Sequence, residues 1–168
     1  MPTSSAWGSG ASGGLLVSAA LYVNPGDEIL VPDPGYPGYR HFVRAFEGKA
    51  RALPVSAAEN FQPTAAMVRA AWGPRTRGVL LGSPSNPTGT LIEPRALEDI
   101  AGFVAERGGV LRVDEIYQGL VYGTQPVTGL GLPGEVVIIN SFSKYFCMTG
   151  WRLGWVVLPQ TAVRGFEK

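Results

Sequence analysis

The sequence predicts an α/β protein with a mostly parallel sheet that is covered by helices on both faces. Along most of its 168 residues, segments typical of strands alternate with segments typical of helices, as in consecutive βαβ units. Val136–Ile139 is a run of four β-branched residues, which favours a strand buried on both faces. Pro94–Arg107 has the apolar spacing of an amphipathic helix, carried by Leu97, Ile100, Ala101 and Val104. A chain of this length can form one domain with a substantial core.

Six strands are expected, each a short apolar segment that ends near glycine, proline or a polar residue. They are Glu28–Val31, Ala50–Val55, Gly78–Leu81, Val110–Val113, Val136–Ile139 and Trp155–Leu158. Four helices are expected between them, at Leu15–Val23, Tyr39–Phe46, Thr64–Trp72 and Pro94–Arg107. Proline and glycine mark the turns, including Asn24-Pro25-Gly26 after the first helix. Met1–Trp7 shows no pattern of either kind, and Gly8–Gly14 is expected to be a glycine-rich loop.

The glycine loop has three interpretations. Gly8, Gly10 and Gly13 fit the dinucleotide pattern G-x-G-x-x-G, with Asp33 20 residues after the last of them. That fingerprint needs a buried strand directly before the first glycine, which Met1–Trp7 does not offer. The interpretation we favour is a loop that opens a helix whose first N–H groups hold a single phosphate. The third is a flexible linker.

The stretch that follows Val136–Ile139 carries the candidate chemistry. The chain turns polar at Asn140, and Lys144 follows Ser141 and Ser143. A lysine just past a buried strand is expected near the interior, where desolvation makes its amine a usable nucleophile. Ser141, Ser143 and Arg152 could hold a phosphate beside Lys144, which is what a phosphorylated aldehyde cofactor requires. The alternative is an ordinary strand-end lysine that faces solvent.

Three polar residues are expected to converge on one edge of the sheet. Asn86, Asp114 and Lys144 each lie just past the end of a predicted strand. Ligands of parallel α/β sheets bind beyond the carboxyl ends of the strands. The sequence therefore places a ligand site at this edge.

These residues stand in motifs that resemble a known family. The motifs are Asn86-Pro87-Thr88-Gly89, Asp114-Glu115-Ile116-Tyr117 and Ser141-Phe142-Ser143-Lys144, with Arg152 eight residues later. In order and spacing they resemble the motif set of class I/II, fold-type-I pyridoxal-phosphate aminotransferases, which are aspartate aminotransferase-like. The resemblance runs from about Gly8 to Lys168. It implies a three-layer α/β/α sandwich with a mixed, mainly parallel sheet, in which Trp155–Leu158 is antiparallel.

The resemblance also implies a role for each matching catalytic residue. Lys144 would form a Schiff base with pyridoxal 5'-phosphate and then move a proton at the substrate Cα. Asp114 would pair with the pyridine nitrogen and keep the ring protonated, so that the ring accepts electrons. Asn86 and Tyr117 would hydrogen-bond the phenolic oxygen of the cofactor.

The remaining cofactor contacts follow from the same resemblance. The phosphate would be bound by Ser141, Ser143, Arg152 and the backbone of Ala11 and Ser12. Tyr36 would lie against the face of the ring, with Tyr39 as a competitor for that position.

The resemblance implies an enzyme that moves an amino group between an amino acid and a 2-oxo acid. Residues 1–168 would be its cofactor-binding large domain, incomplete, because such enzymes usually also have an N-terminal segment and a C-terminal small domain. The arginine that binds the substrate carboxylate normally comes from that C-terminal part, so the substrate is not assigned. The full-length protein would be a homodimer. The alternatives are another enzyme of the same fold, such as a carbon–sulfur lyase or a synthase, and a non-catalytic truncated product.

Composition argues against several other classes of partner. The net charge is +1 and only 16% of residues are charged, so no basic field for nucleic acid is expected. The longest apolar run, Leu15–Val23, is too short to span a bilayer and has no basic segment before it, so neither a membrane segment nor a signal peptide is expected. A single cysteine, Cys147, has no partner for a disulfide or a metal site, which fits a cytoplasmic protein.

Overall fold

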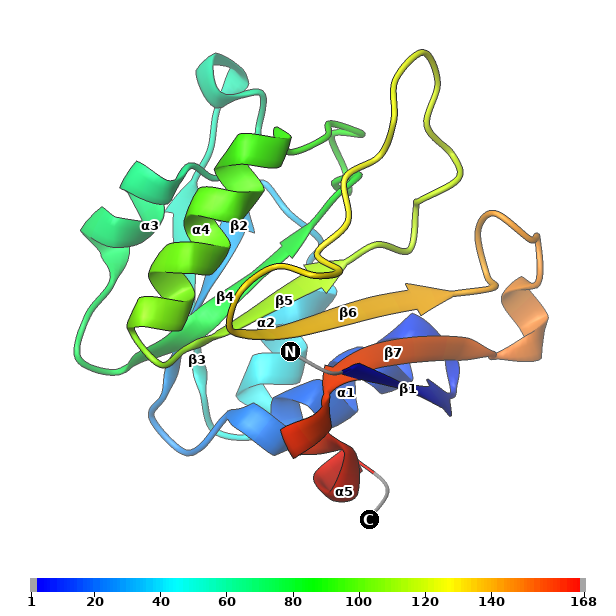
Figure 1. The fold of residues 1–168 in the computed structure, drawn as a ribbon, viewed down its shortest axis with the longest axis horizontal. Coiled ribbons are helices and arrows are strands. Elements are labelled where there is room, and N and C mark those ends of the chain that lie inside the picture. Colours follow the sequence, from blue (N-terminus) through cyan, green and yellow to red (C-terminus); the bar gives the residue numbers. More distant parts are fainter. Residues whose placement is uncertain (1–2, 167–168) are drawn as a thin grey trace.

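The computed structural model describes residues 3–166, which form a seven-stranded sheet between two layers of helices (Figure 1). The strands are β1 (Thr3–Gly8), β2 (Glu28–Asp33), β3 (Lys49–Pro54), β4 (Thr76–Gly82), β5 (Val110–Asp114), β6 (Glu135–Ser141) and β7 (Gly154–Pro159). Their order across the sheet is β1-β7-β6-β5-β4-β2-β3. The five neighbouring strands β3, β2, β4, β5 and β6 pair in parallel, whereas β7 is antiparallel to both β6 and β1. The mixed, mainly parallel sheet and the antiparallel Trp155–Leu158 strand are therefore confirmed.

The helices divide the core into two halves. They are α1 (Gly10–Tyr22), α2 (Gly38–Arg44), α3 (Ala65–Ala71), α4 (Pro94–Glu106) and the short α5 (Val163–Phe166). One face of the sheet packs on α3 and α4 through residues such as Leu97, Leu111 and Val113. The other face packs on α1 and α2 through residues such as Leu15 and Val137. The expected α/β/α sandwich follows from this division.

The six predicted strands and four predicted helices are all present, with ends that differ by a few residues. Val136–Ile139 is buried along its whole length, as the run of β-branched residues predicted. The part of the chain described here holds no helix long and apolar enough to cross a membrane.

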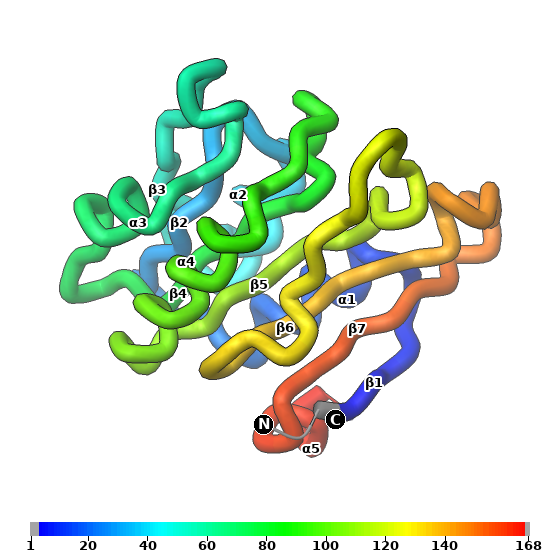
Figure 2. The backbone as a smooth tube through the Cα atoms, turned by 45° about the horizontal axis from the view of Figure 1, so that its top comes forward, coloured from blue at the N-terminus to red at the C-terminus, as the bar shows by residue number. Residues whose placement is uncertain are grey.

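The prediction that Met1–Trp7 contains no element is wrong for its described part, because β1 begins at Thr3; residues 1 and 2 lie outside the described range. The segment Thr-Ser-Ser-Ala-Trp-Gly has no strong β pattern of its own. It becomes a strand because it pairs with the antiparallel β7 from Thr3↔Pro159 to Gly8↔Gly154. Figure 2 shows β1 beside β7 at the edge of the sheet. Tertiary pairing here outweighs local propensity.

The prediction of a loop over Gly8–Gly14 is also wrong, because α1 begins at Gly10. Glycine is a weak helix former, so local propensity favours a loop. The helix forms because its buried side, including Leu15 and Ala19, packs against the strands beneath it. The linker interpretation is excluded by this helix.

The dinucleotide interpretation fails for a reason different from the one expected. A strand does precede the glycines, but it is β1, at the edge of the sheet. Asp33 ends β2, and β7, β6, β5 and β4 all lie between these two strands. The aspartate therefore cannot reach a ligand held at the start of α1 in the way the fingerprint requires.

Candidate active site

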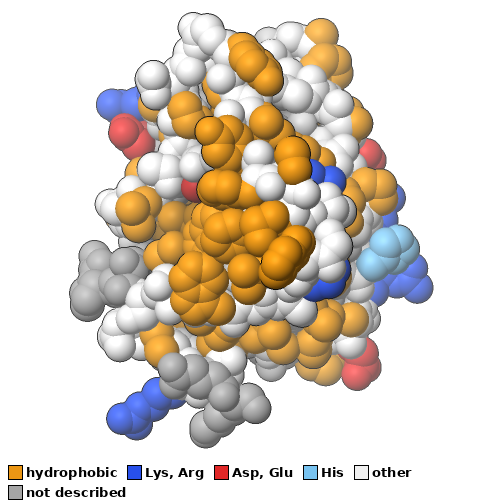
Figure 3. All heavy atoms as spheres, turned by 90° about the vertical axis from the view of Figure 1, so that its right-hand side faces the viewer, with side chains coloured by type: hydrophobic (Ala, Val, Ile, Leu, Met, Phe, Trp, Pro, Cys, Tyr) orange, Lys and Arg blue, Asp and Glu red, His pale blue; other side chains and the backbone are white. Residues whose placement is uncertain are grey.

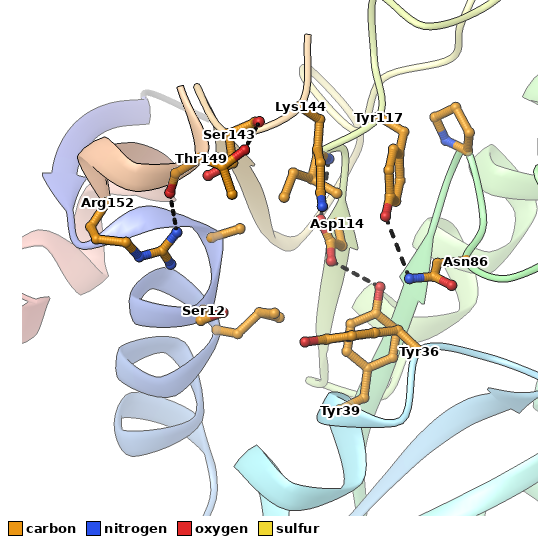
Figure 4. Close-up of a pocket in the computed structure, with 14 residues that line it drawn as sticks. Ser12, Tyr36, Tyr39, Asn86, Asp114, Tyr117, Ser143, Lys144, Thr149 and Arg152 are labelled. Atoms are coloured by element: carbon orange, nitrogen blue, oxygen red, sulfur yellow. Dashed lines mark hydrogen bonds between the residues drawn. The ribbon is translucent and has the colours of Figure 1, made fainter. Parts of the chain in front are cut away.

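A pocket of about 710 Å³, a volume that includes its open mouth, lies at the carboxyl edge of the parallel strands (Figure 4). Nine of the ten predicted site residues line it: Ala11, Ser12, Tyr36, Asn86, Asp114, Tyr117, Ser143, Lys144 and Arg152. Asp114 is the last residue of β5, and Lys144 follows the end of β6. Ala11 and Ser12 belong to the first turn of α1. Residues far apart in the sequence thus meet where the strands end.

Ser141 is the predicted residue that does not line the pocket. It is buried at the end of β6, and its Oγ donates a hydrogen bond to Ser143 Oγ at 2.8 Å. The same Ser141 Oγ accepts the backbone N–H of Ser143 at 2.9 Å. Ser141 therefore lies behind Ser143 and orients it.

Asp114 is buried in neutral surroundings. It is 5% exposed, and its two carboxylate oxygens accept hydrogen bonds from Tyr39 Oη at 3.0 Å and from the Ile116 N–H at 3.2 Å. Burial raises the pKa of Asp114 to about 6, although both hydrogen bonds act to lower it. Within residues 3–166 this carboxylate forms no ion pair. A cation beside it would supply the charge that its surroundings lack.

The sequence offers Tyr39 only as a competitor for the position of Tyr36, whereas the structure gives the two tyrosines different places. Tyr39 is buried and bonds Asp114, and its own pKa is raised well above the usual value by burial and by that carboxylate. Tyr36 lies edge-on to Tyr39, with ring centroids 5.3 Å apart, and lines the pocket. The signal in the sequence is the spacing of three residues, which places Tyr36 two residues before α2 and Tyr39 in its first turn.

Lys144 lies in the pocket but is exposed, so the expectation that it is held near the interior is wrong. It follows β6 by three residues, far enough for the chain to have left the sheet. Its Nζ lies 5.8 Å from the centre of the Tyr117 ring. The Tyr117 Oη accepts a long hydrogen bond of 3.4 Å from Asn86 Nδ2. An amine and a phenol thus face the same space.

Arg152 lies beside the start of α1. Its Nη1 donates to the Thr149 carbonyl at 3.0 Å, and Thr149 Oγ1 donates to the Ser143 carbonyl at 3.0 Å. Its Nη2 passes so close to Gly10 that a Cβ there would lie 2.9 Å away. A guanidinium and the positive end of a 13-residue helix therefore point at the same place, which is a favourable site for an anion.

Thr149, Leu15, Pro84 and Ile116 also line the pocket and were not predicted. Thr149 stands between Gly150 and the lysine motif and carries no pattern of its own. The other three are apolar walls, for which a single sequence gives no chemical signal.

Glu115, next to Asp114, is a second buried carboxyl group, 3% exposed. Burial raises its pKa to about 7, although hydrogen bonds from Gly129 and Thr128 oppose that change. In the unfolded chain the pKa of Glu115 is about 4.5. The folded protein is therefore destabilised by the buried charge as the pH rises from about 4.5 to about 7, and below that range the penalty is absent.

We therefore expect Glu115→Gln to be more stable than the wild type at pH 8, by at most about 3 kcal/mol. At pH 4.5 the two proteins should differ little, because the wild-type carboxyl group is then largely neutral. Urea unfolding of both proteins across this range measures the difference. A difference that does not change with pH would contradict the assignment of the charge to Glu115.

A pocket at the carboxyl edge of a parallel sheet, lined by an amine, a buried carboxylate and an anion site, is typical of an α/β enzyme domain. Comparison with known proteins gives the family: residues 4–168 match the class I and II aminotransferases, and the chain belongs to that family. Enzymes of this family depend on pyridoxal phosphate. The predicted resemblance is thereby confirmed.

Relatives and solved structures agree with this assignment. The valine–pyruvate aminotransferase of Mycobacterium tuberculosis is 41% identical over 160 residues, which are 94% of this chain and 41% of that protein. The crystal structure of an aminotransferase from the same organism has a TM-score of 0.90 at 39% identity, covering 97% of this chain and 42% of that one. For the aromatic aminotransferase of Pyrococcus horikoshii the TM-score is 0.92 at 30% identity, with 98% and 45% covered. The chain thus spans less than half the length of each.

Proposed function

We propose that this chain forms the cofactor-binding part of an enzyme that transfers an amino group from an amino acid to a 2-oxo acid, using pyridoxal phosphate. The observation that carries the proposal is the meeting of Lys144, Asp114 and Arg152 in one pocket. In Figure 4, Lys144 and Asp114 lie between Arg152 on one side and Tyr117 and Asn86 on the other. This arrangement offers one contact for each functional end of the cofactor.

The phosphate would bind beside the start of α1. The Arg152 guanidinium, the Ser143 hydroxyl and the backbone N–H groups of Ala11 and Ser12 would be its donors. Ser141 acts through Ser143, whose hydroxyl it orients. Gly10 fits this role because a side chain there would collide with Arg152.

The ring would bind over Asp114. Its carboxylate would hold the proton of the ring nitrogen, and the Tyr39 hydrogen bond fixes the carboxylate in place. Tyr117 and Asn86 would donate to the phenolic oxygen, and Tyr36 would pack against the face of the ring. A protonated ring nitrogen also supplies the cation that the buried Asp114 carboxylate lacks.

When bound, the cofactor supplies an aldehyde that takes up an amino group and a ring that accepts electrons. Lys144 is the amine that would hold the cofactor covalently. The same Nζ would then move a proton at the substrate Cα, as a general base and acid. Asp114 would keep its negative charge in both steps.

A carbon–sulfur lyase or a synthase would use the same pocket residues. Transamination is favoured because the relatives and structures described above are all aminotransferases. A non-catalytic role of the isolated chain stays open to the test below.

We propose that the full-length protein is a homodimer whose interface includes an aromatic surface beside the pocket. Stacked and tilted ring pairs join Trp7, Phe142, Phe146 and Trp155 into one cluster. Trp7 is 64% exposed. Figure 3 shows hydrophobic side chains gathered on the side of the molecule where, in Figure 1, the loop after β6 lies. A surface of this kind is typical of a protein interface. Light scattering that finds only monomer would contradict this proposal.

We also propose a cytoplasmic location, which cell fractionation tests.

We expect the full-length protein to transfer amino groups, and the 168-residue chain alone to do so at a small fraction of that rate. Arg152 is the only arginine that lines the described pocket, and the phosphate would occupy it. A substrate carboxylate without an anchor loses positioning, which can supply about 7–11 kcal/mol of barrier reduction. The measurement is a panel of amino acids with pyruvate or 2-oxoglutarate as acceptor, run on both proteins with added cofactor. Inactivity of the full-length protein with every pair would contradict the proposed function.

A further inference from the structure

We infer that Glu115, Thr128 and Gly129 form a latch that holds Tyr117 in its place in the pocket. Glu115 is in this account a positioning residue, because it acts on the cofactor through Tyr117. The inference rests on the proposed function, which gives Tyr117 its role. It deepens that proposal by assigning a function to a segment outside the pocket.

The latch closes the base of the segment between β5 and β6. Glu115 Oε1 accepts the backbone N–H of Gly129 at 2.7 Å, and Glu115 Oε2 accepts the Thr128 hydroxyl at 3.2 Å. A third hydrogen bond lies next to these two, from Gln118 Nε2 to the Val127 carbonyl at 2.9 Å. In Figure 1 the segment leaves the end of β5, projects from the body of the protein and returns to begin β6. The two ends of the projection are thus tied by side chains.

The returning end is seated on the core. A Cβ on Gly129 would lie 3.1 Å from Val113 Cγ2 and 3.2 Å from Val136 Cγ1, so the backbone there lies directly against β5 and β6. Both valines belong to the half of the core that packs on α3 and α4. The Asp114 side chain lines the pocket on the other side of the sheet. Glu115 directly follows Asp114, the pocket residue that ends β5, and its hydrogen bonds reach the returning segment on the opposite face of the sheet. It therefore connects the pocket to the half of the core that packs on α3 and α4.

Tyr117 depends on this latch for its position. It lies in the turn that follows Glu115, closed by the bonds Gln118 N–H to Glu115 O at 2.9 Å and Leu120 N–H to Tyr117 O at 3.0 Å. The bond from Asn86 to its phenol is long at 3.4 Å, and a bond of that length constrains the side chain weakly. The backbone turn rather than the phenol contact fixes where the ring meets Lys144.

Three variants of the full-length protein separate the latch from a general effect on folding. Glu115→Ala removes both bonds. Gly129→Ala keeps Glu115 but crowds the returning end against the Val113 and Val136 side chains, so that one side of the contact must shift by a few tenths of an ångström. Glu115→Gln keeps an amide oxygen for the Gly129 N–H and an amide N–H for Thr128, so it should hold Tyr117 in the same position as the wild type does. The matched control is Asp27→Ala. Asp27 is also buried and also accepts loop hydrogen bonds, and it pairs with Arg77 at 3.2 Å. It lies just before the start of β2, at the end of the parallel strands opposite the pocket.

The first measurement is hydrogen exchange of the cofactor-free proteins. In Glu115→Ala, amides of residues 116–127 should exchange at least about tenfold faster, because both hydrogen bonds of Glu115 are lost and one such bond accounts for about that factor. In Gly129→Ala the same amides should also exchange faster. Asp27→Ala should leave this segment unchanged. Unaltered exchange in both latch variants would show that the Glu115 contacts do not hold this segment in place, which would overturn the inference.

The second measurement is a spectroscopic pH titration of pyridoxal phosphate bound to each protein, with Tyr117→Phe as reference. Glu115→Ala and Gly129→Ala should shift the midpoint in the same direction as Tyr117→Phe, and adding Tyr117→Phe to either should cause little further shift. Glu115→Gln and Asp27→Ala should keep the wild-type midpoint. A wild-type midpoint in both latch variants would overturn the inference. If the wild type itself fails to bind the cofactor through Lys144, the proposed function fails, and the role of the latch fails with it.

Discussion

Replacing Lys144 with alanine should reduce amino-group transfer by the full-length protein at least about 1,000-fold, with stability nearly unchanged. The side chain is exposed in the pocket, so its loss leaves no cavity in the core. In the proposed mechanism it both holds the cofactor and moves the proton at the substrate Cα, and a general base alone contributes about 10²–10⁴-fold. Lys144→Arg should fail equally, because a guanidinium stays protonated.

The control for this variant is Lys49→Ala. Lys49 is exposed at the start of β3, at the opposite edge of the sheet from the pocket. Its loss should leave the rate unchanged. Steady-state kinetics with the best substrate pair compares the wild type with the three variants, and a Lys144→Ala rate within tenfold of the wild type would remove Lys144 from the mechanism.

Asp114→Asn should lower turnover about 100- to 1,000-fold while most of the bound cofactor is retained. Asparagine keeps the size of the side chain: its single oxygen can accept the Ile116 N–H, and its NH2 group can donate to the Tyr39 hydroxyl. It cannot hold a positive charge on the ring nitrogen, and that charge matters most as electrons move into the ring. The phosphate contacts are unaffected, so binding should suffer less than turnover.

Tyr39→Phe provides the graded comparison. It removes one hydrogen bond from the carboxylate and leaves the charge, so we expect a loss of about tenfold. The measurements are cofactor content by absorbance and exchange of the substrate Cα proton by NMR. Wild-type exchange in Asp114→Asn would show that this carboxylate takes no part in the proton transfer.

Most of the sheet could be predicted because its strands carry their own signal. Val136–Ile139 and Val110–Val113 are short apolar runs, and burial on both faces is what such runs favour. β1 could not be predicted, since Ser4, Ser5 and Ala6 form a strand only through their pairing with β7. The start of α1 was missed for a related reason: its glycines are weak helix formers, and packing on the sheet outweighs that preference.

The pocket could be predicted from strand ends, because parallel strands bring their carboxyl ends to one edge. Asn86, Asp114 and Lys144 were placed there by this rule alone. The rule does not predict how deeply each side chain is buried. It therefore could not predict that Lys144 is exposed or that Ser141 lies behind Ser143. It also could not find Tyr39 as the partner of Asp114, because that contact joins residues 75 positions apart.

The most direct test of the central claim is to find the lysine that binds the cofactor. Residues 1–168 contain three lysines, Lys49, Lys144 and Lys168, and peptide mapping tells them apart from one another and from any lysine elsewhere in the full-length protein. The full-length protein is loaded with pyridoxal phosphate, reduced with borohydride, digested and mapped by mass spectrometry. Our account predicts a stable cofactor adduct on the peptide that contains Lys144. An adduct on Lys49 or Lys168, with Lys144 unmodified, would contradict it.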